Sequence, residues 1–115
     1  MQVKELTVQK TRLGSYAHLP LNGKWLEEIG FTSGSHVYVV HAHNCLTVTT
    51  SKPNVNDYTI VCVTSRHARH RPRTELVVQI PLLMKLNLHI GDRVGLTYSL
   101  GNIQIQKIKR FGTVA

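Results

Sequence analysis

The sequence predicts a mainly β fold built from two tandem β-β-α-β-β copies, each with one short helix. Three observations predict it. Apolar and polar residues alternate over several short stretches, as they do in half-buried strands. One short segment between two such stretches has helical periodicity instead. Finally, residues Phe31–Thr50 align without a gap on Leu88–Lys107, 57 positions later. We therefore expect two halves that interlock with pseudo-twofold symmetry.

The first strand is predicted over Lys4–Thr11, where Leu6 and Val8 alternate with polar residues. A helix is predicted over Asn22–Ile29. Asn22 is its candidate N-cap, because the side-chain oxygen can accept from N–H groups of the first turn. One face of this helix is apolar and includes Trp25, which we expect to be buried, together with Ile29, against strands of both halves.

Glycine and asparagine mark the turns that follow. Gly30 supplies the left-handed residue that ends the helix, and a second turn is predicted around Gly34. Alternating residues then predict a hairpin, with its turn at His43-Asn44 because Asn tolerates positive φ.

The second copy repeats this layout. Gly91 aligns with Gly34, and Gly101 aligns with Asn44. Upstream, Leu19-Pro20 matches Ile80-Pro81 with four residues fewer before the turn glycine, which predicts a shorter second helix. The segment Tyr58–Thr64 is predicted to be the buried first strand of this copy.

The chain length fits one compact domain over residues 1–115. Within it we assign residues 1–51 to the first copy and 58–111 to the second. Residues 52–57 are rich in turn formers and are predicted to be the linker.

The second copy resembles a known DNA-binding pattern. It has Ile80-Pro81 at a strand end, a short helix, the turn Leu88-His89-Ile90-Gly91-Asp92 and then a hairpin. This order is similar to the AbrB-type swapped-hairpin pattern of the SpoVT/AbrB superfamily. The first copy resembles one branch of it, the SymE toxin family, through the run Gly23-Lys24-Trp25-Leu26-Glu27.

Together the two resemblances cover about four-fifths of the chain. They imply an AbrB-like swapped-hairpin barrel that binds nucleic acid. By analogy they also imply an endoribonuclease that cleaves mRNA as the toxin of a type I toxin–antitoxin system. The chain departs from the family pattern in one respect. A single copy dimerises in much of the family, whereas here a second copy occupies the C-terminal half.

The charge balance favours a polyanionic partner. Fourteen Lys and Arg residues face six acidic residues, which gives a net charge of +8 and a pI near 9.9. Nucleic acid is the leading partner, with duplex DNA favoured and RNA as the alternative. No long basic amphipathic helix and no spanning apolar run are present, so we expect no membrane partner. We expect a cytoplasmic protein, with association with the nucleoid of a bacterium as the alternative.

The most informative charged segment is Ser65–Arg73, which holds four arginines and two histidines without an acid. It is predicted to be the loop that joins the first two strands of the second copy, near the edge where resembling proteins present arginines to DNA. Arginine binds phosphate bidentately or grips guanine, whereas charge runs are otherwise solvated loops. The candidate nucleic-acid-binding residues are Arg66, His67, Arg69, His70, Arg71 and Arg73, with Lys10 and Arg12 from the corresponding part of the first copy. Lys107, Lys109 and Arg110 are expected to be a solvated strand edge.

For catalysis, metal-free RNA cleavage needs an acid, a base and a cation. His18, His67 and His70 are the only candidates beside cations, and no catalytic residue can be assigned among them. A nucleic-acid-binding module is therefore the favoured function, with the endoribonuclease and an antitoxin-like partner protein as alternatives.

No cofactor motif is present. Cys45 and Cys62 are expected to be buried or half-buried free thiols. His41, His43 and Cys45 are not expected to make a metal site, because the predicted turn breaks their alignment. The sequence leaves open whether the copies close within one chain or form a homodimer.

Overall fold

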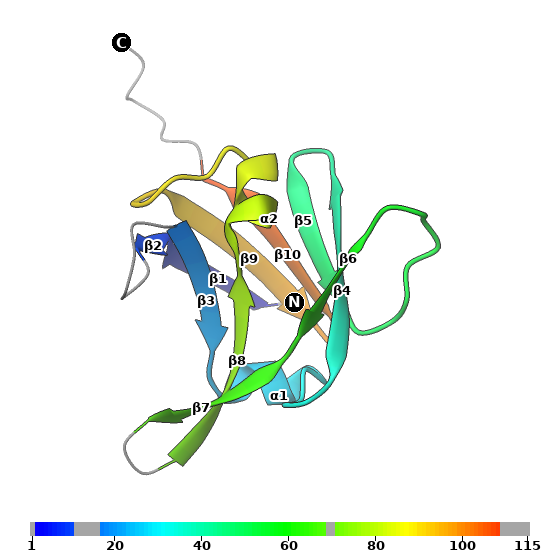
Figure 1. Ribbon diagram of the computed structural model, residues 1–115, viewed down its shortest axis with the longest axis vertical. Coiled ribbons are helices and arrows are strands. Elements are labelled where there is room, and N and C mark those ends of the chain that lie inside the picture. The colour runs from blue at the N-terminus through cyan, green and yellow to red at the C-terminus, as the bar shows by residue number, and fades with distance from the viewer. Residues whose placement is uncertain (1, 11–16, 69–70, 109–115) are drawn as a thin grey trace.

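A computed structural model describes residues 2–10, 17–68 and 71–108, and of 66–68 and 71–73 it describes the backbone alone. These residues form ten strands and two short helices (Figure 1). In chain order the elements are β1 (Gln2–Thr7), β2 (Gln9–Lys10), β3 (Ala17–Asn22), α1 (Lys24–Glu28), β4 (His36–Ala42), β5 (Cys45–Thr49), β6 (Thr59–Cys62), β7 (Thr64–Ala68), β8 (Arg71–Val78), α2 (Ile80–Lys85), β9 (Arg93–Ser99) and β10 (Asn102–Lys107).

The strands form two antiparallel sheets. The six-stranded sheet has the order β1-β9-β10-β5-β4-β6, and the four-stranded sheet has the order β2-β3-β8-β7. The mainly β prediction with one short helix in each copy is confirmed. Strand pairing among the described residues does not join the two sheets, so the closed barrel expected from the sequence is not found there.

The centre of the six-stranded sheet has pseudo-twofold symmetry. In the pairing of β5 with β10, Thr47 lies opposite Gln104, Leu46 opposite Ile105 and Val48 opposite Ile103. Thr47 and Gln104 occupy equivalent positions in the two repeats. A twofold rotation about this pair exchanges the two flanking pairs, Leu46–Ile105 and Val48–Ile103. The two hairpins, β4–β5 and β9–β10, therefore meet through equivalent strands.

The first strand of each half pairs with the hairpin of the other half. Strand β1 lies beside β9, and β6 lies beside β4. Val8 exchanges two backbone hydrogen bonds with the turn Gly91–Asp92, at 2.9 and 2.8 Å, and Val63 exchanges the equivalent two with Gly34–Ser35, at 2.7 and 2.8 Å. Gly34 and Gly91 have φ of 90° and 92°. The prediction that the halves interlock is confirmed.

The sequence alignment placed a gap of four residues upstream of the turn glycine in the second copy, and this prediction is wrong. Strands β3 and β8 pair with Pro20 opposite Val77 and Leu19 opposite Val78. This register is symmetric if Leu19 corresponds to Leu76, so the spacing of 57 positions continues upstream without a gap. Leu19-Pro20 lies inside β3, whereas Ile80-Pro81 begins α2, where Pro suits the first turn. The two Pro dipeptides are therefore not equivalent.

The helices begin and end differently from the expectation. Helix α1 starts after Gly23, at φ 124°, and Asn22 provides no side-chain cap. The backbone carbonyl of Asn22 instead accepts a hydrogen bond from Trp25 Nε1, at 2.9 Å. Helix α2 has six residues against five in α1, so the second helix is not the shorter one. Neither described helix is long and apolar enough to cross a membrane.

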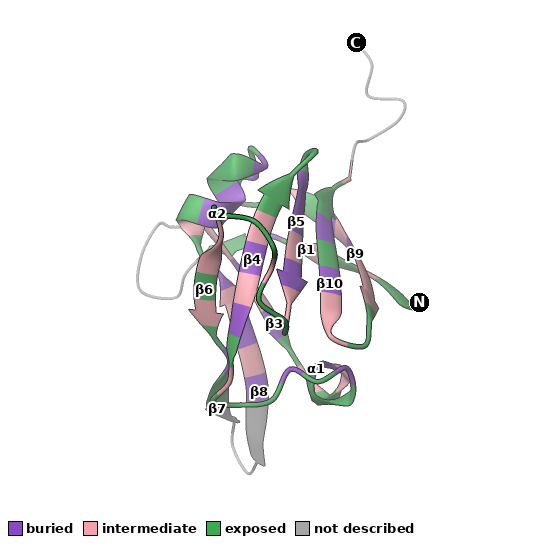
Figure 2. Cartoon of the chain, turned by 90° about the vertical axis from the view of Figure 1, so that its right-hand side faces the viewer, coloured by how far each residue is buried: buried purple, intermediate pink, exposed green. Residues whose placement is uncertain are grey.

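The hydrophobic core lies between the two sheets, and both halves contribute equivalent residues to it. Along β4 and β10, buried positions alternate with intermediate or exposed ones (Figure 2). Buried equivalents include Phe31 and Leu88, Val37 and Val94, Val39 and Leu96, Leu46 and Ile103, and Val48 and Ile105. Ile29 is buried as predicted, whereas Trp25 is only partly buried.

Strand β6 is an edge strand, not the buried strand predicted over Tyr58–Thr64. It pairs with β4 on one side, and Ile60 is 56% exposed. Apolar, β-branched composition does not distinguish a buried strand from an edge strand, because both have the same backbone preference.

The local turn predictions hold. His43 and Asn44 have φ of 54° and 58° and join β4 to β5 directly, as the two residues of a type I′ hairpin turn do. Gly101 joins β9 to β10 with φ of 72°. Residues 51–58 connect β5 to β6 without helix or strand.

Candidate nucleic-acid interface

The arginine-rich segment forms a two-stranded ribbon, not a loop. Strands β7 and β8 pair from Thr64 opposite Glu75 to Ala68 opposite Arg71. Only the last part of β8, from Glu75 to Val78, also pairs with β3. The outer part of the β7–β8 hairpin therefore extends beyond the rest of the four-stranded sheet, at the lower left of Figure 1.

The base of this hairpin is fixed to the body. Thr74 is 6% exposed, and its carbonyl accepts a hydrogen bond from Gly23 N–H, at 3.2 Å. The Thr64 hydroxyl donates to the backbone carbonyl of Glu75, also at 3.2 Å. The first contact joins the hairpin to the segment before α1, and the second joins the two strands of the hairpin to each other at their base.

The register concentrates positive charge along the hairpin. Arg66 lies opposite Arg73, and His67 lies opposite Pro72. Arg71 lies nearer the tip, opposite Ala68. Arg69 and His70 lie outside the described residues.

The candidate residues of the first copy are not brought to this hairpin. Lys10 is exposed at the end of β2, opposite Ala17. Strands β2 and β7 are the two opposite edges of the four-stranded sheet. Arg12 lies outside the described residues. Any contact that Lys10 makes with nucleic acid is thus separate from the hairpin.

The candidate catalytic histidines are also separated. His18 lies on β3 beside Leu19, which is opposite Val78, whereas His67 is opposite Pro72 on the same strand. Six residues of β8 separate these positions, about 20 Å along an extended strand. His18 and His67 therefore do not form an acid–base pair. His70 lies outside the described residues.

Lys107 has a structural role. Its Nζ lies 3.6 Å from Asp92 and donates to the carbonyl of Asn87, at 3.2 Å. The His89 backbone N–H donates to Asp92 at 2.8 Å, and this bond, followed by the Lys107 charge, lowers the pKa of the Asp92 carboxyl. The turn after α2 is stabilised by these contacts.

A groove beside the hairpin was not anticipated from the sequence. It has a volume of about 450 Å³ and is lined by residues of β6, the end of β8 and the start of α2, together with Thr64. Its lining includes Thr59, Val61, Cys62, Val77, Pro81 and Leu82. The sequence signal that could have predicted this groove is the lack of charged residues in β6. The equivalent strand β1 contains Lys4 and Glu5.

The two cysteines differ in access. Both are free thiols, as predicted, and Cys45 is buried, but the prediction that Cys62 is buried or half-buried is wrong, because Cys62 is exposed. Among the described residues, no group of three or more His, Cys, Asp or Glu side chains is placed to hold a metal ion.

Comparisons of the chain with models of protein families, with curated proteins and with solved structures gave no match.

Proposed function

We propose that this protein binds nucleic acid, with duplex DNA favoured, through the β7–β8 hairpin. The observation that carries the proposal is a two-stranded ribbon that leaves the body and has four arginines, two histidines and no acid between Ser65 and Thr74. The major groove of B-DNA, about 12 Å wide, admits a two-stranded β-ribbon. Arginine suits this position because its planar fork can bind phosphate or guanine bidentately.

The overall charge supports the same partner. A net charge of +8 on 115 residues attracts a polyanion at long range and speeds its encounter with the protein. Phosphate contacts from the hairpin would supply most of the affinity, and contacts with base edges would supply any sequence preference.

The resemblance to the AbrB-like superfamily and its SymE branch supports the proposal independently of the hairpin. A swapped-hairpin arrangement would interlock two copies, and the pairing of β1 with β9 and of β6 with β4 supports this proposal. We propose that the two copies within one chain take the place of the two subunits of a family dimer.

The test is the salt dependence of binding to a short DNA duplex. If five phosphates are neutralised, log K should fall with a slope of about −4.5 against log[salt]. The variant with Arg66→Ala, Arg71→Ala and Arg73→Ala should reduce both the affinity and that slope. A matched control, Lys24→Ala with Lys52→Ala and Lys85→Ala, removes the same charge from exposed positions elsewhere and should change both much less. Equal losses in the two variants would show that binding does not depend on the hairpin.

A further inference from the structure

In the second half of the chain, the groove between β6 and β8 is open. In the first half, side chains fill the equivalent position. Its counterpart residues follow from the spacing of the repeats, because the paired hydrogen bonds of Val8 and Val63 align β1 with β6. Leu82 then corresponds to Trp25, and Thr59 corresponds to Lys4. In the first half the Trp25 ring packs against Tyr98, with centroids 4.6 Å apart, and Lys4 Nζ lies 5.4 Å from the ring centroid.

The edge of the groove also differs between the halves. Strand β1 carries Lys4 and Glu5, and Glu5 forms an ion pair with Arg93 at 3.6 Å. Charged residues of this kind protect an edge strand from unwanted pairing. The corresponding residues of β6 are Thr59 and Ile60, and β6 has no charged residue. The second half thus lacks both the aromatic ring and the charges that cover this position in the first half.

The groove is continuous with the arginine-rich hairpin. Thr64 lines the groove and is also the first residue of β7. Arg66 lies two residues further along this strand, about 7 Å away. A ligand in the groove would therefore have the cationic hairpin directly beside it, which fits an aromatic group joined to an anionic backbone.

We infer that the groove accepts one unpaired nucleobase of the nucleic acid that the hairpin binds. The inference rests on the proposed function and extends it, because it predicts that the protein prefers nucleic acid that contains an unpaired base. The Trp25 ring in the first half shows that a planar aromatic group fits between equivalent elements, and apolar side chains commonly hold a base removed from its stack. Gln79 also lines the groove, and the side-chain amide of Gln can pair with a base edge.

The experiment compares three labelled ligands by fluorescence anisotropy. They are a fully paired DNA duplex, the same duplex with one unpaired thymidine, and the same duplex with an abasic nucleotide in place of that thymidine. We expect the unpaired thymidine to strengthen binding about 5- to 10-fold, at the lower end of what one stacked base gives. The abasic ligand should lose that gain, because it keeps the backbone of the extra nucleotide but has no base to insert.

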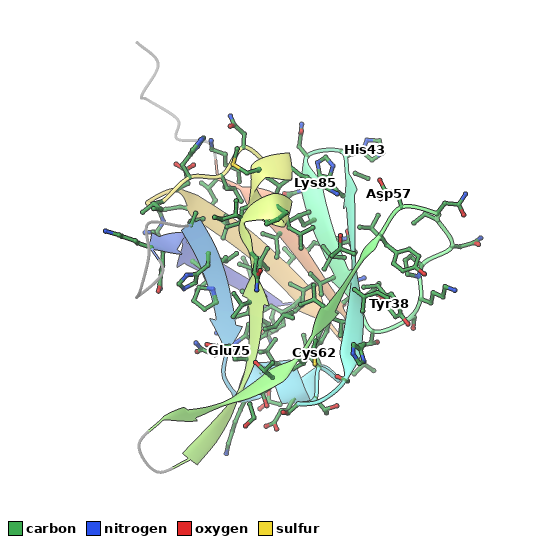
Figure 3. The ribbon with its side chains drawn as sticks, in the orientation of Figure 1. Tyr38, His43, Asp57, Cys62, Glu75 and Lys85 are labelled. Carbon is green, nitrogen blue, oxygen red and sulfur yellow. The ribbon has the colours of Figure 1, made fainter. Side chains whose placement is uncertain are left out.

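Two blocked forms test the groove itself. Leu82→Trp combined with Thr59→Lys copies the filled half and should remove the gain while leaving the affinity for paired duplex within about twofold. Treating the wild type with N-ethylmaleimide should block the groove without any substitution in the core, because Cys62 is exposed and is one of the residues that line the groove, whereas Cys45 is buried. Cys62 is labelled in Figure 3. The matched control, Cys62→Ser treated in the same way, should keep the gain. The thymidine ligand should also slow alkylation of Cys62.

The outcomes separate the two proposals. Equal affinity for all three ligands, with no protection of Cys62, overturns the groove inference and leaves hairpin binding intact. Equal gains from thymidine and the abasic nucleotide also overturn it. Loss of hairpin dependence in the arginine variants overturns the proposed function instead. Protection of Cys62 by a synthetic peptide with the sequence of residues 2–10, but not by the thymidine ligand, would assign the groove to a protein strand.

Discussion

Thr47 and Gln104 lie opposite each other where β5 meets β10, and each is the equivalent of the other in the repeat. A pseudo-twofold axis therefore passes between two residues of one chain. The same axis relates β1 to β6, β3 to β8 and the turns at Gly34 and Gly91. Each half consequently depends on the other for the partners of its first strand, its third strand and its hairpin.

The first prediction is that neither half folds as a monomer. Fragment 1–57 keeps the β4–β5 hairpin but loses β9, β8 and β10, which pair with β1, β3 and β5 respectively. We expect circular dichroism to show each isolated fragment largely unfolded at low concentration. Mixing 1–57 with 58–115 should restore the strand signal. Sedimentation that showed a folded monomer of either fragment would contradict this dependence.

The second prediction concerns the paired turn glycines. Gly34 and Gly91 have φ of 90° and 92°, and a Cβ added at either position would meet no atom within 4 Å. Replacing either by Ala therefore adds backbone strain alone, about 1–2 kcal/mol. Urea unfolding should give nearly equal losses for Gly34→Ala and Gly91→Ala.

A contrasting control is Gly101→Ala. Its φ is 72°, and the new Cβ would lie 2.9 Å from Thr50 Oγ1, so a steric cost is added to the strain. We expect the loss to exceed that of the other two. A large difference between Gly34→Ala and Gly91→Ala would show that the halves are not equivalent at these turns.

The third prediction concerns Trp25, which the sequence favours as a fully buried residue. Full burial would make Trp25→Ala cost about 3–5 kcal/mol. Because the side chain is only partly buried, we expect about 2–3 kcal/mol by denaturant unfolding. Trp25→Phe should cost less, since a ring can still pack on Tyr98 but the hydrogen bond to Asn22 is lost. A loss below about 0.5 kcal/mol for Trp25→Ala would show that the ring does not stabilise the fold.

The turns and hairpins could be predicted from the sequence because their determinants are local. His43-Asn44 and Gly34 require positive φ, and the residues present tolerate it. The position of Leu19-Pro20 could not be predicted in the same way. Pro20 is accommodated inside β3 because β2 pairs with that strand only at Ala17 and His18. The rest of β3 pairs with β8, whose residues lie far along the chain, so a single sequence does not place the two strands side by side.

The candidate site was predictable in composition but not in shape. The arginine run is visible in the sequence, yet Arg, His and Pro do not indicate strands, so its extension as a ribbon could not be predicted. The groove depends on Val77 and Leu82 lying beside β6. Nothing in a single sequence places these segments together, because β6 and β8 do not pair with each other in either sheet.

The fourth prediction concerns pH. Asp92 has a lowered pKa, chiefly because the His89 backbone N–H donates to it and also because Lys107 is near. A carboxyl with a lowered pKa in the folded state adds stability above its unfolded pKa, near 3.8, and loses it as the pH falls through the lower folded value. Asp92→Asn should thus destabilise the protein at pH 7 by about 0.5–1.5 kcal/mol.

The difference between Asp92→Asn and the wild type should shrink as the pH falls below 3.8. Ser35 is the equivalent position of the first half, so Ser35→Ala is the matched control. Its effect on the free energy of unfolding should not change over this pH range, because it removes no titrating group. A pH-independent effect of Asp92→Asn would show that the ionised carboxylate does not stabilise the turn.

The last prediction separates a binding protein from the endoribonuclease alternative. A metal-free ribonuclease needs an acid and a base on the same scissile phosphate, whereas the positions of His18 and His67 are about 20 Å apart along β8. We therefore expect the purified protein to bind duplex DNA and to cleave RNA no faster than a contaminant control. The triple variant His18→Ala, His67→Ala and His70→Ala should bind nearly as well as the wild type, since the hairpin keeps all four of its arginines. Removing a general acid or base typically costs ~10²–10⁴-fold in rate. RNA cleavage that survives purification and is lost in the triple variant, while binding persists, would therefore reverse this ranking and favour the toxin.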